Sequence, residues 1–291
     1  MIGSREMKLP KLTAQTDAAL PVTVIRPPSG WVTLGVREIW EFRELLFFLV
    51  WRDLKVRYRQ TLLGASWAVI QPLSTMVIFS VFFGRLARVP SDGVPYPVFS
   101  FAGLVPWTFF ATALTQASTS LVLHQHLVKK VYFPRLVIPI AVVLVGIVDF
   151  AIAFVVLIGM MASYGLTPTW HVVWTPLLLG LAIVTALGAG IWFAALNVRY
   201  RDVQYLVPFL AQMWLFMTPV AYPSSLLGEP WRTVYGLNPM VGVVEGFRWA
   251  LLGTATAPGP TVAMSVAAAL ALLVGAVYFF RRVESTFADT V

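Results

Sequence analysis

A run of residues without a single charge, from Leu62 to Phe83, constrains this chain more than any other feature. At 1.5 Å per residue, a helix over this run is about 33 Å long, which is enough to cross the ~30 Å hydrocarbon core of a bilayer. Pro72 lies inside the run and predicts a kink. The preceding segment is basic, with cations at Arg52, Lys55, Arg57 and Arg59. Cations followed by an apolar run mark a membrane surface.

Further apolar runs predict an all-α integral membrane protein with six transmembrane helices. Only 12% of the 291 residues are charged and 58% are hydrophobic, whereas about a quarter of a soluble domain is charged. The surplus apolar surface should therefore face lipid. The other expected spans are Val98–Leu123, Leu136–Met161, His171–Leu196, Tyr205–Tyr222 and Thr261–Phe280.

Outside the spans, the sequence predicts three further segments. Residues 1–35 mix charges, Thr, Ala and Pro, and are expected to form a mobile cytoplasmic arm. Residues 36–61 are expected to hold an amphipathic interface helix and the basic junction. The six-span domain covers residues 62–280, and residues 281–291 form a cytoplasmic tail. In the interface helix, the apolar residues at helical spacing are Ile39, Phe42, Leu46 and Leu49, and the aromatic residues expected to widen that face are Trp40, Phe47, Phe48 and Trp51.

The segment between spans five and six is apolar but too short and too charged to cross a membrane. It predicts two short re-entrant helices, roughly Pro230–Tyr235 and Pro239–Leu252. Glu245 and Arg248 are three residues apart on the second helix, so we expect them to pair directly. Together with Asn238 they are candidates for an outer gate. Gly242 and Gly246 form a small-xxx-small pair, which suits close helix packing.

The positions of the cations predict the orientation in the membrane. Of the 21 Lys and Arg residues, all lie in segments expected on one side except Arg85, Arg88, Arg232 and Arg248. The positive-inside rule then places both termini in the cytoplasm, as an even number of spans requires. We expect a multi-pass protein of the bacterial inner membrane.

Motifs for chemistry are missing from the sequence. It has no cysteine, and its histidines are His124, His126 and His171, without a metal-ligand spacing. It has no phosphate-binding loop and no zinc-protease or serine-hydrolase motif. We therefore expect no catalytic residues, no bound metal and no cofactor. The cations lie at span ends, so we expect membrane lipids rather than nucleic acid as partners.

Four runs, in this order, carry a resemblance to a known family: RDLKVRYRQTLLGASWAVIQPL, LVKKVYFPR, NVRYRDV and NPM…EGFRW. The chain resembles, from about Trp31 to Arg282, the permease subunit of type-2 ABC exporters of O-antigen, capsule or teichoic acid. The resemblance implies a homodimer on two copies of a separate ATPase subunit, which binds ATP and Mg. It also implies export of a polysaccharide linked to polyprenyl pyrophosphate, with O-antigen as the first expectation.

The resemblance also suggests roles for residues. The loop His124–Arg135 would hold the helix that couples the chain to its ATPase, and the basic junction would attract the lipid pyrophosphate. Aromatic faces that stack on sugars would line the path of the polymer. The coupling residues are Leu127, Lys129, Lys130, Tyr132, Phe133, Pro134 and Arg135. The lipid-pyrophosphate residues are Arg52, Lys55, Arg57 and Arg59. The channel residues are Trp67, Trp107, Phe110, Trp214, Phe216 and Tyr222.

Some alternatives remain open at the level of the sequence. The chain could be the permease of a type-2 exporter for drugs or lipids, or a membrane enzyme that acts on lipid-linked sugars, although its acids are not clustered. Each junction cation could bind bulk anionic lipid, and each aromatic residue could lie at the headgroup level. Asp149 lies in the middle of the third span, where a charge needs a partner. We expect it to pair structurally rather than to relay protons.

Overall fold

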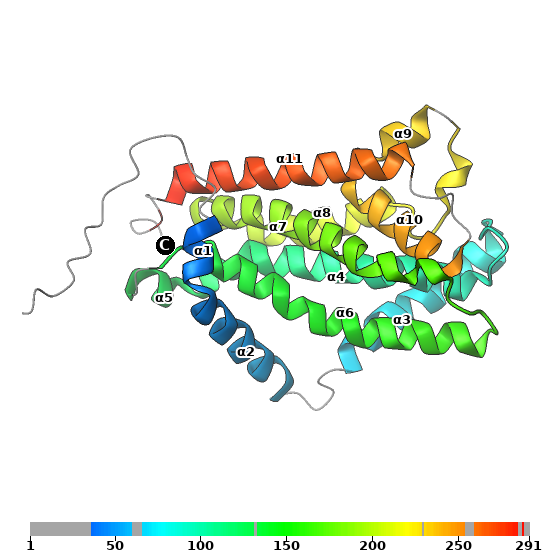
Figure 1. The fold of residues 1–291 in the computed structure, drawn as a ribbon, viewed down its shortest axis with the longest axis horizontal. Coiled ribbons are helices and arrows are strands. Elements are labelled where there is room, and N and C mark those ends of the chain that lie inside the picture. The colour runs from blue at the N-terminus through cyan, green and yellow to red at the C-terminus, as the bar shows by residue number, and fades with distance from the viewer. Residues whose placement is uncertain are drawn as a thin grey trace, which may run out of the picture. The chain divides into compact units, whose positions relative to one another are not determined.

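The computed structural model describes residues 36–59, 66–130, 133–228, 230–253, 259–284 and 287. The predicted arm and most of the predicted tail lie outside this part of the chain. The regular elements of the described residues are all helical (Figure 1). They are α1 (Val36–Glu41), α2 (Arg43–Arg59), α3 (Trp67–Phe79), the π-helix η2 (Ser80–Leu86), α4 (Tyr96–Leu123), α5 (Gln125–Lys130), α6 (Val137–Ser163), the 3₁₀ helix η3 (Trp170–Trp174), α7 (Thr175–Arg199), α8 (Val203–Phe216), η4 (Ser224–Leu226), α9 (Trp231–Tyr235), α10 (Pro239–Leu252) and α11 (Pro260–Val283).

Within the described residues, five helical stretches are long and apolar enough to cross a membrane. They are Trp67–Leu86, Tyr96–Leu123, Val137–Ser163, Trp170–Arg199 and Pro260–Val283. The predicted span Tyr205–Tyr222 differs, because α8 has only 14 residues and ends at Phe216. The chain then turns, and Pro219 lies in that turn. Proline lacks the N–H that a continuing helix would use, which explains why the helix stops before the end of the apolar run.

The first span passes through Pro72 without a break. α3 includes Pro72 and continues to Phe79. The helical geometry changes further on, at Ser80, where the π-helix begins. There the N–H of Ala87 bonds the carbonyl of Phe82, five residues earlier, at 2.9 Å. The wider turn carries the chain to Arg88 and Asp92, both with positive φ.

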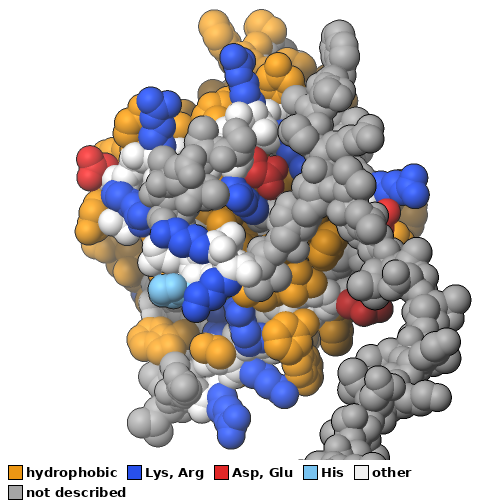
Figure 2. All heavy atoms as spheres, turned by 90° about the vertical axis from the view of Figure 1, so that its left-hand side faces the viewer, with side chains coloured by type: hydrophobic (Ala, Val, Ile, Leu, Met, Phe, Trp, Pro, Cys, Tyr) orange, Lys and Arg blue, Asp and Glu red, His pale blue; other side chains and the backbone are white. Residues whose placement is uncertain are grey.

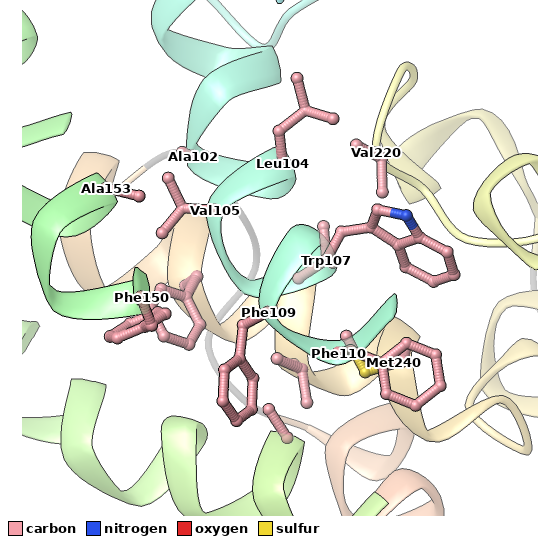
Figure 3. Packing of buried hydrophobic residues seen from close by; sticks show 14 of the residues in the cluster. Ala102, Leu104, Val105, Trp107, Phe109, Phe110, Phe150, Ala153, Val220 and Met240 are labelled. Carbon is pink, nitrogen blue, oxygen red and sulfur yellow. The ribbon is translucent and has the colours of Figure 1, made fainter. Parts of the chain in front are cut away.

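The first hydrophobic core surrounds α4. This helix packs against α6 and α7 along its length, and against α3, α8 and α10. Small residues allow the close approach of α7: a Cβ on Gly190 would lie only 2.7 Å from the Cβ of Ala117. Figure 3 shows the large side chains of this core, with Trp107, Phe109 and Phe110 on α4.

A second hydrophobic core lies at the end of the molecule that carries α5. It joins Leu49 of α2, Val128 of α5, Phe133 and Phe280 of α11. On α2 the predicted apolar face is correct, since Leu49 is buried and Phe42 and Leu46 are half-buried. The aromatic residues do not widen this face, because they project from the opposite side and stay exposed. They are Trp40, Phe47, Phe48 and Trp51.

The short helices α9 and α10 lie at the opposite end from α5 (Figure 1). Their bounds follow the predicted ones closely. α10 packs between α7 and α11 through the two predicted glycines. A Cβ on Gly242 would lie 2.5 Å from Ser265, and one on Gly246 would lie 2.5 Å from Leu178. α10 is therefore part of the core, with most of its residues buried.

Candidate functional site

Asp149 of α6 forms a polar cluster with the end of α2. The guanidinium of Arg57 donates to one oxygen of Asp149 and the hydroxyl of Tyr58 donates to the other. Arg57 also donates to the side-chain carbonyl of Gln116 on α4. The side chains of Arg57 and Asp149 are each 25% exposed. Burial, and then the hydrogen bond to Asp149, raise the pKa of Tyr58, so the phenol stays protonated and donates. The predicted structural pairing of Asp149 is therefore confirmed.

This cluster forms one end of a cavity of about 250 Å³ between α2, α3, α4 and α6. Trp67 and Gln71 come from α3, and Thr108, Thr112 and Gln116 follow one another at helical spacing on α4. Arg57 and Gln116 also line a second cavity of about 290 Å³, together with Asp53 and Val56. The Arg57–Gln116 hydrogen bond thus lies in the wall between the two cavities.

The other cations of the basic junction differ in what they contact. Arg52 pairs with Asp53 at 2.8 Å and lies 2.8 Å from Nε2 of His124. Since arginine only donates, His124 accepts through Nε2 and donates through Nδ1 to the carbonyl of Ser120, at 2.9 Å. The ammonium of Lys55 lies 5.2 Å above the ring of Trp51, and Arg59 is exposed.

The predicted coupling loop is partly exposed and partly built into the second core. Lys129 and Lys130 are exposed, and Leu127 and Pro134 are half-buried. Phe133 is only 5% exposed and packs in the second core of the single chain, and its contact with an ATPase stays a prediction. Tyr132 lies outside the described residues. Lys and Arg side chains gather on this end of the molecule, as Figure 2 shows.

Arg135 of the coupling loop contacts residues near the end of the chain. Its guanidinium bonds the backbone carbonyl of Glu284, and its backbone N–H donates to the Glu284 carboxylate at 3.4 Å. It also lies 5.8 Å from the ring of Phe287. Arg281 connects Glu284, at 3.5 Å, with Glu38 of α1, at 2.6 Å. Burial raises the pKa of Glu284, and the neighbouring Arg281 partly offsets this.

The predicted channel aromatics fall into two groups. Trp107 and Phe110 are buried in the first core (Figure 3), and the ring of Phe110 lies 4.9 Å from that of Trp214. Both are buried within the single described chain, and their role in lining a path stays a prediction. Trp67 and Phe216 are more than half exposed. Tyr222 is half-buried and donates to, or accepts from, the hydroxyl of Tyr235 at 2.8 Å.

The expected ion pair between Glu245 and Arg248 is wrong. Arg248 is 1% exposed and donates to the carbonyls of Phe99, Pro219, Val220 and Tyr222. Its guanidinium also lies 3.6 Å from the ring of Phe99. Within the described residues, the cation that pairs with Glu245 is Arg232, at 3.5 Å. Glu245 also accepts from the N–H and hydroxyl of Ser224. The turn after α8 presents carbonyls that the sequence pattern does not reveal.

Asn238, the third residue of the predicted gate, is an N-cap. Its side-chain oxygen accepts from the N–H of Met240, at 3.1 Å, and from the indole of Trp214, at 2.8 Å. Its amide donates to the carbonyl of Met217 and the hydroxyl of Thr218. Every polar atom of this side chain is used, so Asn238 fixes the start of α10 against the end of α8.

Several residues at these sites were not among the sequence candidates. Tyr58, Gln116, Ser224, Arg232 and Glu284 each hold a predicted residue in place. The only signal in the sequence was polarity within or beside apolar runs, and it does not identify partners that lie 13 to 149 residues away.

Comparison with known proteins gives a consistent result. The sequence matches the family described as ABC-2 type transporter over residues 44–252. It is 33% identical over 260 residues to the O-antigen export system permease protein RfbA of Myxococcus xanthus, which covers 88% of this chain and 98% of that protein. RfbA of Klebsiella pneumoniae is 31% identical over 206 residues, covering 70% and 79%. The polysialic acid transport protein KpsM of Escherichia coli is 23% identical over 206 residues, covering 69% and 78%. This chain belongs to the ABC-2 type transporter family.

Proposed function

We propose that this chain is the membrane permease of an ATP-driven exporter that moves lipid-linked polysaccharide, with O-antigen foremost, across the bacterial inner membrane. One observation carries the proposal: a relative named as an O-antigen export permease aligns over 98% of its length at 33% identity. The sequence has no phosphate-binding loop of its own. ATP hydrolysis would therefore belong to a separate ATPase subunit.

In this proposal, α8 is a sixth span and both termini are cytoplasmic. Figure 2 supports the orientation, since Lys and Arg gather on the end that carries α5 and the last turn of α11. The exposed aromatic side of α1 and α2 suits a helix that lies in the membrane interface. At the opposite end, α9 and α10 would be re-entrant helices.

A homodimer is what the family resemblance implies, and the single chain leaves apolar faces exposed that a second copy could cover. On α8, Phe209, Met213 and Phe216 are about half exposed, and on α3 and η2 so are Val77, Ile78 and Phe82. A second copy would cover part of these faces and enclose the path of the polymer. Trp67 and Phe216 are the predicted channel residues with the surface to line it, and Trp214 and Tyr222 could contribute at its edge.

On the cytoplasmic side, we assign coupling to the exposed part of the loop. Lys129 and Lys130 at the end of α5 would contact the ATPase. A movement of the coupling loop would then be transmitted to α11 through the hydrogen bonds between Arg135 and Glu284. The lipid pyrophosphate would meet Lys55 and Arg59, which are exposed, rather than Arg57, which is paired with Asp149.

Deletion of the gene, with surface polysaccharide and ATPase activity as readouts, tests this proposal. We expect loss of surface polysaccharide and its return with the wild-type gene. The double variant Lys129→Glu, Lys130→Glu should be inserted normally but lose export and stimulation of its ATPase. Arg201→Glu with Arg282→Glu is the matched control, because both cations are exposed and lie outside the loop. Unchanged surface polysaccharide in the deletion strain would overturn the proposal.

A further inference from the structure

The cavity beside Asp149 has the composition of a ligand site rather than of a packing defect. Empty cavities in proteins are apolar, and roomy polar ones hold something. Here Arg57, Tyr58, Gln116 and Asp149 make part of the lining polar, beside apolar lining residues of α4 and α6 such as Val105 and Phe150. An ionisable residue at membrane depth is expensive to keep and usually marks a function.

The walls of this cavity carry polar groups that are free to bind. The hydroxyls of Thr108 and Thr112 and the amide of Gln71 make no hydrogen bond to another residue in the part of the chain that the structure describes. Thr115, on the same helix, does not line the cavity and donates to the carbonyl of Ala111 at 2.8 Å. The free hydroxyls of α4 thus lie on the cavity side.

The charge of the cavity selects against anions. Arg57 and Asp149 are the charged residues of its lining, and they form an ion pair. Their charges cancel, so a phosphate or a carboxylate would have to break the pair to gain a partner. A neutral ligand with several hydroxyl groups would instead find donors and acceptors already in place.

The size and the aromatic wall restrict the ligand further. A volume of about 250 Å³ is just below the roughly 300–1,000 Å³ of drug-sized pockets, so it fits a single ring and not a segment of chain. Trp67, 56% exposed, lies at the rim. Its indole is an apolar face with one donor, which suits the C–H face of a sugar ring.

We propose that this cavity binds one neutral sugar ring, stacked on Trp67 and hydrogen-bonded by Thr108, Thr112, Gln71 and the Arg57–Asp149 cluster. This inference rests on the proposed function, since a sugar must reach the cavity from the exported chain. In that setting, the site would hold one unit of the polymer between steps. A cavity on each chain of a dimer would give the exporter two such sites, each opening at Trp67 toward the shared path.

Trp67 itself reports on the binding of probes. The full chain with its ATPase in lipid nanodiscs is titrated with methyl α-D-glucoside, methyl α-D-mannoside, L-rhamnose and glucose 6-phosphate. The Trp67→Phe variant is subtracted to isolate the fluorescence of Trp67. We expect a saturable change with at least one neutral sugar at millimolar concentration, about −4 kcal/mol, and none with glucose 6-phosphate. The double variant Thr108→Val, Thr112→Val should weaken binding about tenfold, and Thr115→Val should not.

Export of polysaccharide in cells provides a second test of the inference. We expect the double threonine variant, at normal protein level, to lower surface polysaccharide several-fold in the deletion strain, and Thr115→Val to restore it fully. A response to glucose 6-phosphate alone, or no response of Trp67 to any neutral sugar, would overturn the inference. If deletion of the gene leaves surface polysaccharide intact, the proposed function fails instead, whatever Trp67 reports.

Discussion

Removal of the Arg248 guanidinium should be one of the most costly single changes in this chain. The side chain is 1% exposed and donates to the carbonyls of Phe99, Pro219, Val220 and Tyr222. Hydrogen bonds from a charged donor contribute about 1.5–3 kcal/mol each, but burial of the charge itself costs several kcal/mol. For Arg248→Ala, we therefore expect a net loss of about 3–5 kcal/mol, the range for a broken buried charge contact.

Lysine at this position should recover only part of the loss. Its ammonium carries the charge but is a single point with three donors, whereas the planar guanidinium reaches four separate carbonyls. We expect Arg248→Lys to cost about 1–3 kcal/mol, since three donors leave at least one of the four buried carbonyls unpaired.

Thermal unfolding of the purified chain in one detergent, followed by intrinsic tryptophan fluorescence, measures these differences. On the scale of about 2–4 °C per kcal/mol for larger domains, the Tm of Arg248→Ala should fall by at least about 6 °C. Arg282→Ala, which removes an exposed cation, is the control and should shift Tm very little. The reasoning is refuted if Arg248→Ala melts with the wild type, or if its effect disappears in a Glu245→Ala background, as a Glu245–Arg248 pair would require.

Three other outcomes follow from the contacts. Asp149→Asn should leave Arg57 without its countercharge and reduce stability by about 3 kcal/mol, which lowers Tm, and adding Arg57→Met to this variant should restore part of the loss. Equal Tm for the wild type, the single variant and the double variant would contradict the pairing. Phe133→Ala should lower the free energy of unfolding by about 3–5 kcal/mol, because it leaves a cavity in the second core. Lys130→Ala should leave this free energy almost unchanged. A lower Tm for Lys130→Ala than for Phe133→Ala would show that Phe133 is not buried. The raised folded-state pKa of Glu284 means that its contribution to stability is present below its ordinary pKa of 4.5 and is lost as pH rises through the higher folded-state pKa. The Tm difference between wild type and Glu284→Gln should therefore shift against the wild type as pH rises over that window, and a pH-independent difference would contradict this.

Spans were predictable because the bilayer imposes a simple rule. A helix without charges must be about 20 residues long to cross, so Leu62–Phe83 or Val98–Leu123 can be found by reading along the chain. Five stretches of the described residues satisfy this rule. The end of α8 could not be found this way, since the residues after Phe216 are as apolar as those before it and only Pro219 interrupts them.

Contacts between side chains were predictable only where they are local. The glycines of α10 were recognised because residues four apart share a helix face. The same reasoning failed for Glu245 and Arg248, since each found better partners far along the chain, in Ser224 and Arg232 or in the carbonyls after α8. Likewise, Asp149 was recognised as needing a partner, but nothing local to α6 identifies Arg57.

In the proposed six-span arrangement, the short length of α8 has a consequence for the surrounding lipid. Fourteen residues give a helix of about 21 Å, which is about 9 Å shorter than an average hydrocarbon core. Hydrophobic mismatch costs a fraction of a kcal/mol per Å, and Tyr205, Phe209 and Phe216 on its outer side are exposed. A bilayer of short-chain lipids would match this helix, whereas a thick bilayer would favour its coverage by protein. Membrane thickness would then influence the assembly of this chain independently of ATP and substrate.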